Sequence, residues 1–319
     1  MSQFLRRIKI QIDRITGPGI VGTTTIIEEM KMVFDIKKIP DTHNIAKIEI
    51  FNLSQETRDK IEDMNIFVSI SAGYEGNPLK LLFKGKFFHV VHKYDVPEII
   101  TTIEAKDVGP FNKNIDILTV AINIDGPTTM KNVIKNIIRE TAYPTKNDIL
   151  DTNAQDRNLA TGYSNGGHLK QILDELTSGL GISWSLQDGA IQFLERGETF
   201  DQSATIILSE KTGLIGIPQK GNEEGIWNKR AFFKDNPKKR KQKAASQPFY
   251  LVESLLQPTA EIGGLVRVIS QKANLDTEFT IDAIEHVGGN FDTQFITKFK
   301  LLHNVFSEPL SDLVGIAVV

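Results

Sequence analysis

Ser164 stands in the sequence pattern with the clearest possible chemistry, nucleophilic hydrolysis. Residues 162–166 read Gly-Tyr-Ser-Asn-Gly, which matches the turn that places a serine between an apolar strand and a helix in α/β-hydrolases. The residues just before this motif are rich in Asn, Asp and Gln, so they do not have the composition of a central strand. We therefore expect a polar surface loop over about 144–166 that leads into a helix. A hydrolase using Ser164 stays open as an alternative.

A second glycine pattern lies near the N-terminus. Residues 17–22 read Gly-Pro-Gly-Ile-Val-Gly and match the dinucleotide-binding fingerprint. That fingerprint needs a buried parallel strand before it and a helix after it, so that the pyrophosphate meets a helix N-terminus. Here the preceding strand carries charges at alternate positions, and three threonines, residues 23–25, follow. The pattern therefore predicts a glycine-rich turn between two strands.

A short basic segment could contact an acidic surface or nucleic acid. Five cationic residues lie within 237–243, a density typical of nuclear-localisation or nucleic-acid segments. Like charges repel one another, so a solvated loop is the simplest interpretation. No aromatic residues alternate with the charges, so a platform for stacking bases is missing. The cationic residues are Lys238, Lys239, Arg240, Lys241 and Lys243.

No other residues form a catalytic or metal-binding pattern. The chain has no cysteine, which excludes disulfides, thiolate metal sites, iron–sulfur clusters and cysteine nucleophiles. His89 and His92 are three residues apart, a spacing that puts them on opposite faces of a strand. Carboxylates are scattered and suggest no acid–base pair. We therefore expect no enzyme activity, no cofactor and no metal.

Length and composition indicate a folded protein of about two domains. The 319 residues are 40% hydrophobic and 24% charged, and 37 basic against 40 acidic residues give a net charge of −3. No run of 18 apolar residues suggests a membrane span, and charges interrupt the first fifteen residues, which disfavours a signal peptide. We expect folding in a reducing cytoplasm.

The first hundred residues alternate between apolar and polar positions, the period of half-buried strands. One short helix interrupts them, with Ser54 as its N-cap, Glu56 in its first turn and Ile61 on its buried side. Many short strands with one polar face predict an antiparallel barrel or sandwich. The predicted strands centre on residues 8–12, 30–36, 46–50, 66–72 and 99–105.

The pattern changes near Gly109. Apolar residues at helical spacing predict one helix opened by Pro127 and a second over 169–176 that ends at Gly179 or Gly181. Asp188-Gly189 follows between two alternating runs, which predicts a two-residue hairpin. Strands return from about residue 200, at 204–208, 265–268, 279–283 and 295–301.

Taken in order, these segments resemble the baseplate hub proteins of phage tails. The similar segments are residues 44–54, 68–74, 82–85, 103–107, 173–194, 208–218, 254–258, 262–264 and 284–289. Within them, the residues that match the family's structural motifs are Asn52, Leu53, Gly73, Tyr74, Gly85, Asp107, Gly213, Leu214, Pro218, Leu255, Leu256, Pro258, Gly263 and His286.

The resemblance implies an α+β fold that is mainly antiparallel β. Two tube-like β-barrel domains, 1–108 and 200–305, would flank a small α+β domain, 109–199, and 306–319 would form a C-terminal tail. The sequence leaves open whether residues 200–235 complete the first barrel or begin the second.

The resemblance also implies a structural role in the virion, in the tail baseplate, after synthesis in the cytoplasm of a bacterial host. A homotrimeric ring would join the sixfold tail tube or tail-initiation proteins to the threefold central spike. Baseplate wedge proteins are further partners, no membrane is involved, and DNA is cargo in the lumen. We expect the apolar tail residues Leu313, Val314 and Ile316 to dock on a neighbour. The alternatives are a tail-associated hydrolase using Ser164 and a nucleic-acid-binding module using Lys238–Lys243.

Overall fold

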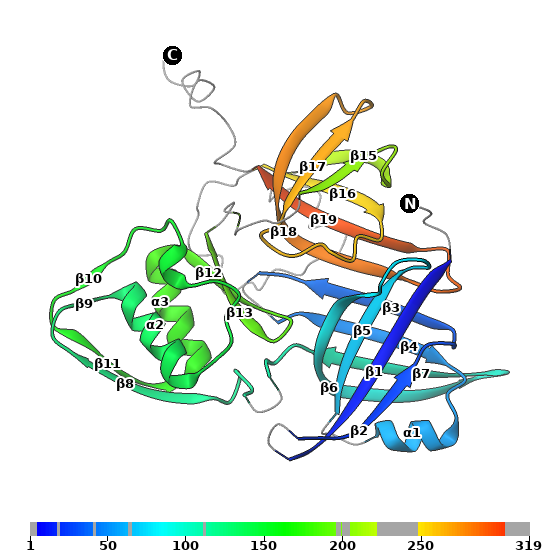
Figure 1. The fold of residues 1–319 in the computed structure, drawn as a ribbon, viewed down its shortest axis with the longest axis horizontal. Coiled ribbons are helices and arrows are strands. Elements are labelled where there is room, and N and C mark those ends of the chain that lie inside the picture. The colour runs from blue at the N-terminus through cyan, green and yellow to red at the C-terminus, as the bar shows by residue number, and fades with distance from the viewer. Residues whose placement is uncertain are drawn as a thin grey trace. The chain divides into compact units, whose positions relative to one another are not determined.

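A computed structural model describes residues 5–17, 20–40, 43–62, 66–110, 113–195, 199, 205–221 and 248–303. The chain divides into two compact units. The first comprises Met1–Arg196 with two returning segments, Leu256–Thr259 and Glu285–Ile296, and the second comprises the remainder. Most strand pairs are antiparallel, as the sequence predicted (Figure 1). No helix among these residues is long and apolar enough to cross a membrane.

The first unit contains an antiparallel sheet in the order β3-β4-β7-β6-β5-β1-β2. Its apolar side chains alternate with polar ones, and the inward set forms one core with Phe34, Phe83 and Ile103 fully buried. The five strands predicted from alternation are confirmed as β1 Arg6–Gly17, β3 Met32–Lys38, β4 Ile45–Phe51, β5 Ile66–Tyr74 and β7 Glu98–Lys106. The structure adds β2 Ile20–Ile27 and β6 Lys80–Asp95.

The glycine-rich motif lies between two paired strands, as predicted. Gly17 at the end of β1 is opposite Ile20 at the start of β2, and Pro18 and Gly19 lie outside the described residues. Because β2 follows in place of a helix, the motif cannot present a pyrophosphate to a helix N-terminus.

The predicted short helix is α1, Gln55–Ile61. The Ser54 side chain accepts a hydrogen bond from the Thr57 N–H, Glu56 lies in the first turn, and Ile61 is buried. This cap satisfies one of the N–H groups that a helix start leaves unpaired.

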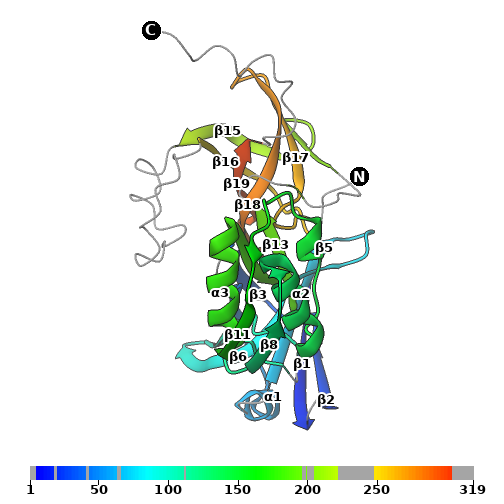
Figure 2. The same cartoon turned by 90° about the vertical axis from the view of Figure 1, so that its left-hand side faces the viewer.

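A helical region forms a separate core within the first unit. Figures 1 and 2 show α2, Met130–Thr141, beside α3, Leu169–Leu180. Gly181, one of the two glycines that the sequence offered as the end of this helix, follows α3 with φ +73. Asp188 and Gly189 both have positive φ and connect a hairpin, which is also confirmed. The other elements are β8 Thr119–Asp125, β9 Thr128–Thr129, the 3₁₀ turn η1 Ile149–Asp151, β10 Asn158–Leu159, β11 Gly162–His168, β12 Ile182–Gln187 and β13 Ala190–Glu195.

The predicted loop over 144–166 is wrong at its end. Residues 162–166 belong to β11, which pairs with β8 in antiparallel register. The sequence does not predict this strand because it consists largely of glycines and small polar residues. Its stability comes from its partner strand and from packing beside α3.

The second unit contains β15, β16 and the greater parts of β18 and β19, in the order β15-β16-β19-β18, and β17 joins β14 to β18. β14 pairs with β17 in parallel. Both strands predicted at 204–208 and 265–268 are present. The bounds are β14 Ile206–Ser209, β15 Leu214–Gly221, β16 Phe249–Leu255, β17 Leu265–Ser270, β18 Leu275–Gly289 and β19 Phe295–His303.

Candidate assembly surfaces

Asp107, one of the motif residues, lies at a buried junction between the sheet and the helical region of the first unit. Its two carboxylate oxygens accept hydrogen bonds from the N–H groups of Gly109 and Gly189, both at 3.1 Å. Only 1% of Asp107 is exposed. Burial raises the pKa of Asp107 to about 6, and the two N–H donors oppose that rise. Because Gly189 lies in the β12–β13 turn, Asp107 connects the end of β7 to this hairpin.

His43 contacts the same junction from the segment before β4. Its Nδ1 lies 2.7 Å from the carbonyl oxygen of Asp107, and its Nε2 lies 2.9 Å from Asp116. Burial lowers the pKa of His43, and the Lys106 charge adds to this effect. Burial alone would raise the pKa of Asp116, but a 2.7 Å hydrogen bond from Lys106 and nearby positive charges hold it below its usual range.

Lys38 connects the last residue of β3 to the same hairpin. Its ammonium group donates to Asp188 at 3.0 Å, although only 3% of Lys38 is exposed. Nearby, the Asn44 amide donates to the side-chain oxygen of Gln187 at 3.1 Å. A buried lysine is stable only when it is paired, so these contacts fix the hairpin against β3 and β4. The sequence analysis missed Lys38, although it occupies the position that continues the buried alternation of Met32, Phe34 and Ile36.

Most other motif residues in the first unit determine backbone geometry. A Cβ atom on Gly85 would lie 2.6 Å from the carbonyl oxygen of Lys106, so only glycine fits there. Asn52 has φ +60, and its side-chain oxygen accepts a hydrogen bond from the Ile99 N–H at 2.9 Å. Leu53 and Tyr74 are buried in the sheet core, and Gly73 precedes Tyr74 in β5.

The late motif residues fall in both units. In the second unit, Gly213 has φ +107, and its carbonyl accepts from the Leu255 N–H at 2.8 Å. Leu214 and Pro218 belong to β15, and Gly263 donates to the Ile281 carbonyl at 2.8 Å. The structure therefore does not gather the motif residues into one site.

Three other motif residues belong to the first unit. Leu256 donates to the Phe295 carbonyl at 3.0 Å, and Pro258 lies in the same returning segment. Burial of His286 lowers its pKa to about 3, with the charge of Lys38 adding to the effect. His286 is therefore an uncharged residue of the fold at neutral pH.

Arg6 fixes the turn between β18 and β19, and no local sequence signal predicts this. Its guanidinium donates to the carbonyl oxygens of Gly289, Thr293 and Gln294 at 3.1–3.3 Å, and also to that of Asp292. The same group lies 5.3 Å from the centre of the Phe295 ring. The contacts cross 283–288 positions of sequence, so only the folded chain reveals them.

Asn290 holds the same turn from its other side. The Asn290 side chain accepts from the Met32 N–H at 2.9 Å and donates to the Met30 carbonyl at 2.7 Å. The turn is therefore bound to Arg6 at the start of β1 and to Met32 at the start of β3.

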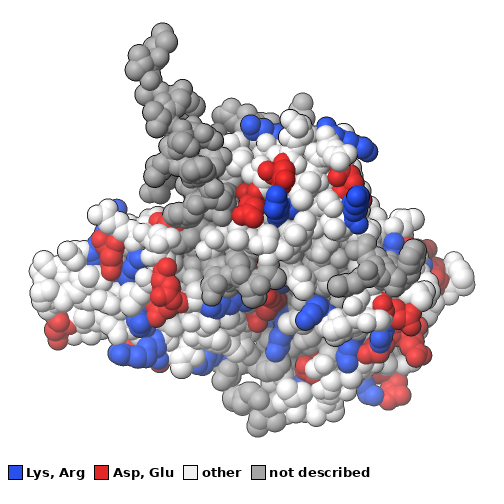
Figure 3. All heavy atoms as spheres, turned by 45° about the horizontal axis from the view of Figure 1, so that its top comes forward, with Lys and Arg blue, Asp and Glu red and all other residues white. Residues whose placement is uncertain are grey.

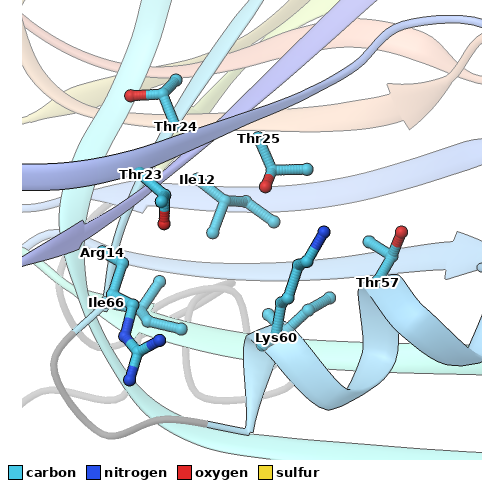
Figure 4. Close-up of a pocket in the computed structure, with 9 residues that line it drawn as sticks. Ile12, Arg14, Thr23, Thr24, Thr25, Thr57, Lys60 and Ile66 are labelled. Atoms are coloured by element: carbon cyan, nitrogen blue, oxygen red, sulfur yellow. The ribbon is translucent and has the colours of Figure 1, made fainter.

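β2 is the edge strand of the first unit, and a pocket of about 300 Å³ lies beside it. Figure 4 shows Thr23 and Thr25 on the strand side of this pocket, and Thr57 and Lys60 on α1 opposite them. Its other lining residues, completing the set, are Ile12, Arg14, Thr24, Ile61 and Ile66. The buried isoleucines give the pocket an apolar floor, whereas Arg14 and Lys60 place two cationic groups at its rim.

Among the remaining residues that the sequence pointed to, the structure describes Ser164 but not the basic segment or the tail residues. Ser164 is exposed in β11, opposite Asn123 of β8, so it does not occupy a strand-to-helix elbow. The basic residues of 237–243 and the tail residues Leu313, Val314 and Ile316 lie outside the described residues. On the face shown in Figure 3, Lys and Arg alternate with Asp and Glu without a patch of one sign.

Comparison with known proteins decides the family. The family model described as baseplate hub gp41 matches residues 8–235, more than two thirds of the chain. The chain belongs to this baseplate hub family. No curated protein matches the hub chain.

Solved structures agree with that assignment at the level of the fold. The hub chain is similar to a tail protein from Neisseria meningitidis MC58, with 13% identity, a TM-score of 0.55, and coverage of 94% of this chain and 97% of that one. A 43 kDa tail protein of prophage MuSo2 from Shewanella oneidensis gives 10% identity, a TM-score of 0.58, and coverage of 93% and 98%.

The E. coli c3393 protein, a type VI secretion component, gives 11% identity, a TM-score of 0.52, and coverage of 86% and 74%. That protein is described as structurally similar to the T4 tail proteins gp27 and gp5. The hub chain therefore shares its fold with components of phage tails and of a related injection machine.

Proposed function

We propose that the hub chain forms a homotrimeric ring at the centre of a phage tail baseplate. The ring joins the sixfold tail tube, or tail-initiation proteins, to the threefold central spike and leaves a passage for DNA. Baseplate wedge proteins bind outside it. The chain acts in the virion after synthesis in the bacterial cytoplasm, and its role is structural and not enzymatic.

The match of the baseplate hub family over residues 8–235 carries this proposal. The two β-rich units in each chain also support it, because three copies supply six such units. Cyclic closure then lets a threefold ring face a sixfold tube. We further propose two tube-like barrels, near 1–108 and 200–305, around the small α+β region, and a role in partner contact for Lys238, Lys239, Arg240, Lys241 and Lys243.

Native mass spectrometry tests the ring directly. The chain has a mass of 35.6 kDa, so a trimer has three times that mass, 106.8 kDa. We expect the trimer for the chain alone or after co-expression with its spike. A monomer under both conditions would overturn the proposal.

A further inference from the structure

β2 is an edge strand that lacks the charged residues and the proline that often protect such edges, although its pairing with β1 has register shifts around Ile15. Residues 20–27 contain no charge and no proline, and among the described residues β2 pairs with β1 alone. Val21 is 43% exposed and Ile26 is 54% exposed. Proteins normally block exposed edges with lysine, proline or bulges, because an open edge recruits another strand. An edge of this kind, uncharged and without proline, therefore indicates a strand that is covered after assembly.

The edge strand of the second unit, β15, differs in composition, because it contains Pro218 and Lys220. Its pairing with β16 has an irregular register between Ile215 and Gln219, a feature that it shares with the pairing of β2. The absence of charge and proline in β2 is therefore not general to the edges of this chain.

The chain itself contains a segment with complementary properties. Residues 313–319 read Leu-Val-Gly-Ile-Ala-Val-Val, an uncharged sequence without proline and rich in β-branched side chains, which favours strand pairing. Two acidic residues, Glu308 and Asp312, precede it. The segment begins ten positions after His303, the last described residue.

Charge supports the same pairing. Arg14 and Lys60 stand at the rim of the pocket that Thr23, Thr24 and Thr25 of β2 help to line. In the structure, Lys60 pairs with Glu56 on the same helix at 2.6 Å, and both groups are well exposed. Asp312 immediately before the uncharged segment could therefore share this cationic rim, while the pairing with β2 supplies backbone hydrogen bonds.

We propose that residues 313–319 of a second copy of the hub chain add a strand to the β2 edge, with Asp312 at the Arg14–Lys60 rim. This inference rests on the proposed trimer only for the supply of the second copy. Backbone pairing provides most of the affinity, and the alternate side chains of the added strand provide the register.

Site-directed cross-linking of the full chain tests this docking, because the chain has no cysteine of its own. Thr23→Cys is combined with single cysteines at successive positions from 313 to 319, and the control replaces Thr23→Cys with Ile117→Cys. Ile117 is 71% exposed and lies in the helical region. We expect disulfides with Thr23→Cys that alternate strong and weak along the segment, because successive side chains of a strand point to opposite faces. Equal cross-linking at all positions would contradict a paired strand.

Mixing experiments identify which copy supplies the strand. One chain carries only Thr23→Cys, and the other carries only the most reactive tail cysteine. A disulfide between the two chains supports a second copy. The alternative result is a disulfide that forms only in chains carrying both cysteines, and only within one chain. That result would show that each tail docks on its own β2 and would overturn the proposal.

Two variants then test the chemistry of the edge. Ile26→Lys should lower the cross-linking rate at least fivefold by placing a charge on the edge, whereas Ile117→Lys should leave it within twofold. Arg14→Gln with Lys60→Gln should lower it about two- to fivefold, as expected for exposed ion pairs. Unchanged rates in both Ile26→Lys and the Arg14→Gln, Lys60→Gln variant would overturn the assignment of this edge.

The mass of each sample separates the two proposals. A trimer without cross-links above the Ile117→Cys control would overturn docking on β2 and leave the trimeric hub intact. A monomer without such cross-links would overturn both proposals.

Discussion

Gly85 shows how one missing side chain permits the pairing of two strands. Its position leaves no room for a Cβ atom beside the Lys106 backbone, and backbone cannot move as freely as a side-chain end. Gly166 in β11 has more space, since a Cβ there would meet its nearest neighbour at 3.8 Å.

We expect Gly85→Ala to lower the free energy of unfolding by about 1–3 kcal/mol, the usual cost of overpacking. Urea denaturation measures this change. Gly166→Ala serves as the matched control and should cost less than half as much. Equal effects of the two substitutions would show that the contact at Gly85 is not the cause.

Asp107 predicts a specific pH dependence. Its pKa of about 6 in the folded chain lies above the ordinary value of 3.8. The carboxyl group therefore contributes stability below pH 3.8, and this contribution is lost as the pH rises through 6. The Asp107→Asn side chain is neutral throughout, and the titrations of His43 and His286 cancel in the comparison.

We expect the unfolding free energy of the natural chain, minus that of Asp107→Asn, to fall between pH 4 and pH 7 by on the order of 3 kcal/mol. Denaturant titrations across this range measure the difference. A difference that stays constant, or rises with pH, would show that burial does not raise this pKa.

At the scale of elements, the turn between β18 and β19 depends on Arg6. One guanidinium donates to the carbonyl groups of Gly289, Thr293 and Gln294, and the Gln294 carbonyl also accepts from the Gly289 N–H at 3.2 Å. We expect Arg6→Ala to cost about 2 kcal/mol of unfolding free energy, as for the loss of charged hydrogen bonds. Hydrogen exchange in residues 289–295 should also become faster.

Arg7 provides the neighbouring control for this prediction. It also lies in β1, but it is 51% exposed and its nearest carboxylate, Glu28, is 3.9 Å away. Arg7→Ala should therefore change the unfolding free energy by less than about 0.5 kcal/mol. If Arg6→Ala leaves exchange in the turn unchanged, the hydrogen bonds of Arg6 do not hold the turn.

Local chemistry explains which elements the sequence could predict. Asp188-Gly189 was recognised because both positions need positive φ, and Ser54 because a helix start needs an acceptor for its free N–H groups. β11 was missed because a glycine-rich strand has no apolar alternation of its own. The parallel pairing of β14 was missed because its partner, β17, lies more than fifty residues away.

The candidate surfaces were predicted less well than the fold. Asp107 and Gly85 were identified by resemblance, but their roles depend on Gly189 and Lys106, which only the folded chain brings to them. The contacts of Arg6 join opposite ends of the sequence and have no periodic signal. Lys38 could have been identified as a contact residue from its place in the alternating run of β3, which puts it on the buried side of the strand. A buried lysine needs a partner.

At the scale of the whole molecule, the first unit is not a continuous stretch of sequence. Phe295 from a returning segment packs edge-on against Phe34 and Tyr74, with ring centres 5.9 and 5.4 Å apart. A fragment ending at residue 196 lacks this ring and the turn that Arg6 binds. We expect the fragment 1–196 to unfold at lower urea concentration than the chain 1–303, which keeps every described strand.

Near-ultraviolet circular dichroism and urea denaturation test this expectation. The helical core, which contains Trp184, should keep its signal in the fragment, because all its members lie within residues 115–193. A fragment that unfolds at the same midpoint as the chain 1–303 would show that the returning segments add no stability to the first unit.

Because Phe295 lies late in the sequence, the first unit cannot be completed until long after its other strands have been synthesised. A ribosome that has completed β7 must add 190 more residues, from 106 to 296, before the last segment of the first unit exists. At about 5–20 residues per second, this takes about 10–40 s. During that interval the rings of Phe34 and Tyr74 lack the Phe295 ring against which they pack. A nascent chain of this hub therefore offers chaperones an apolar binding surface that the finished protein no longer has.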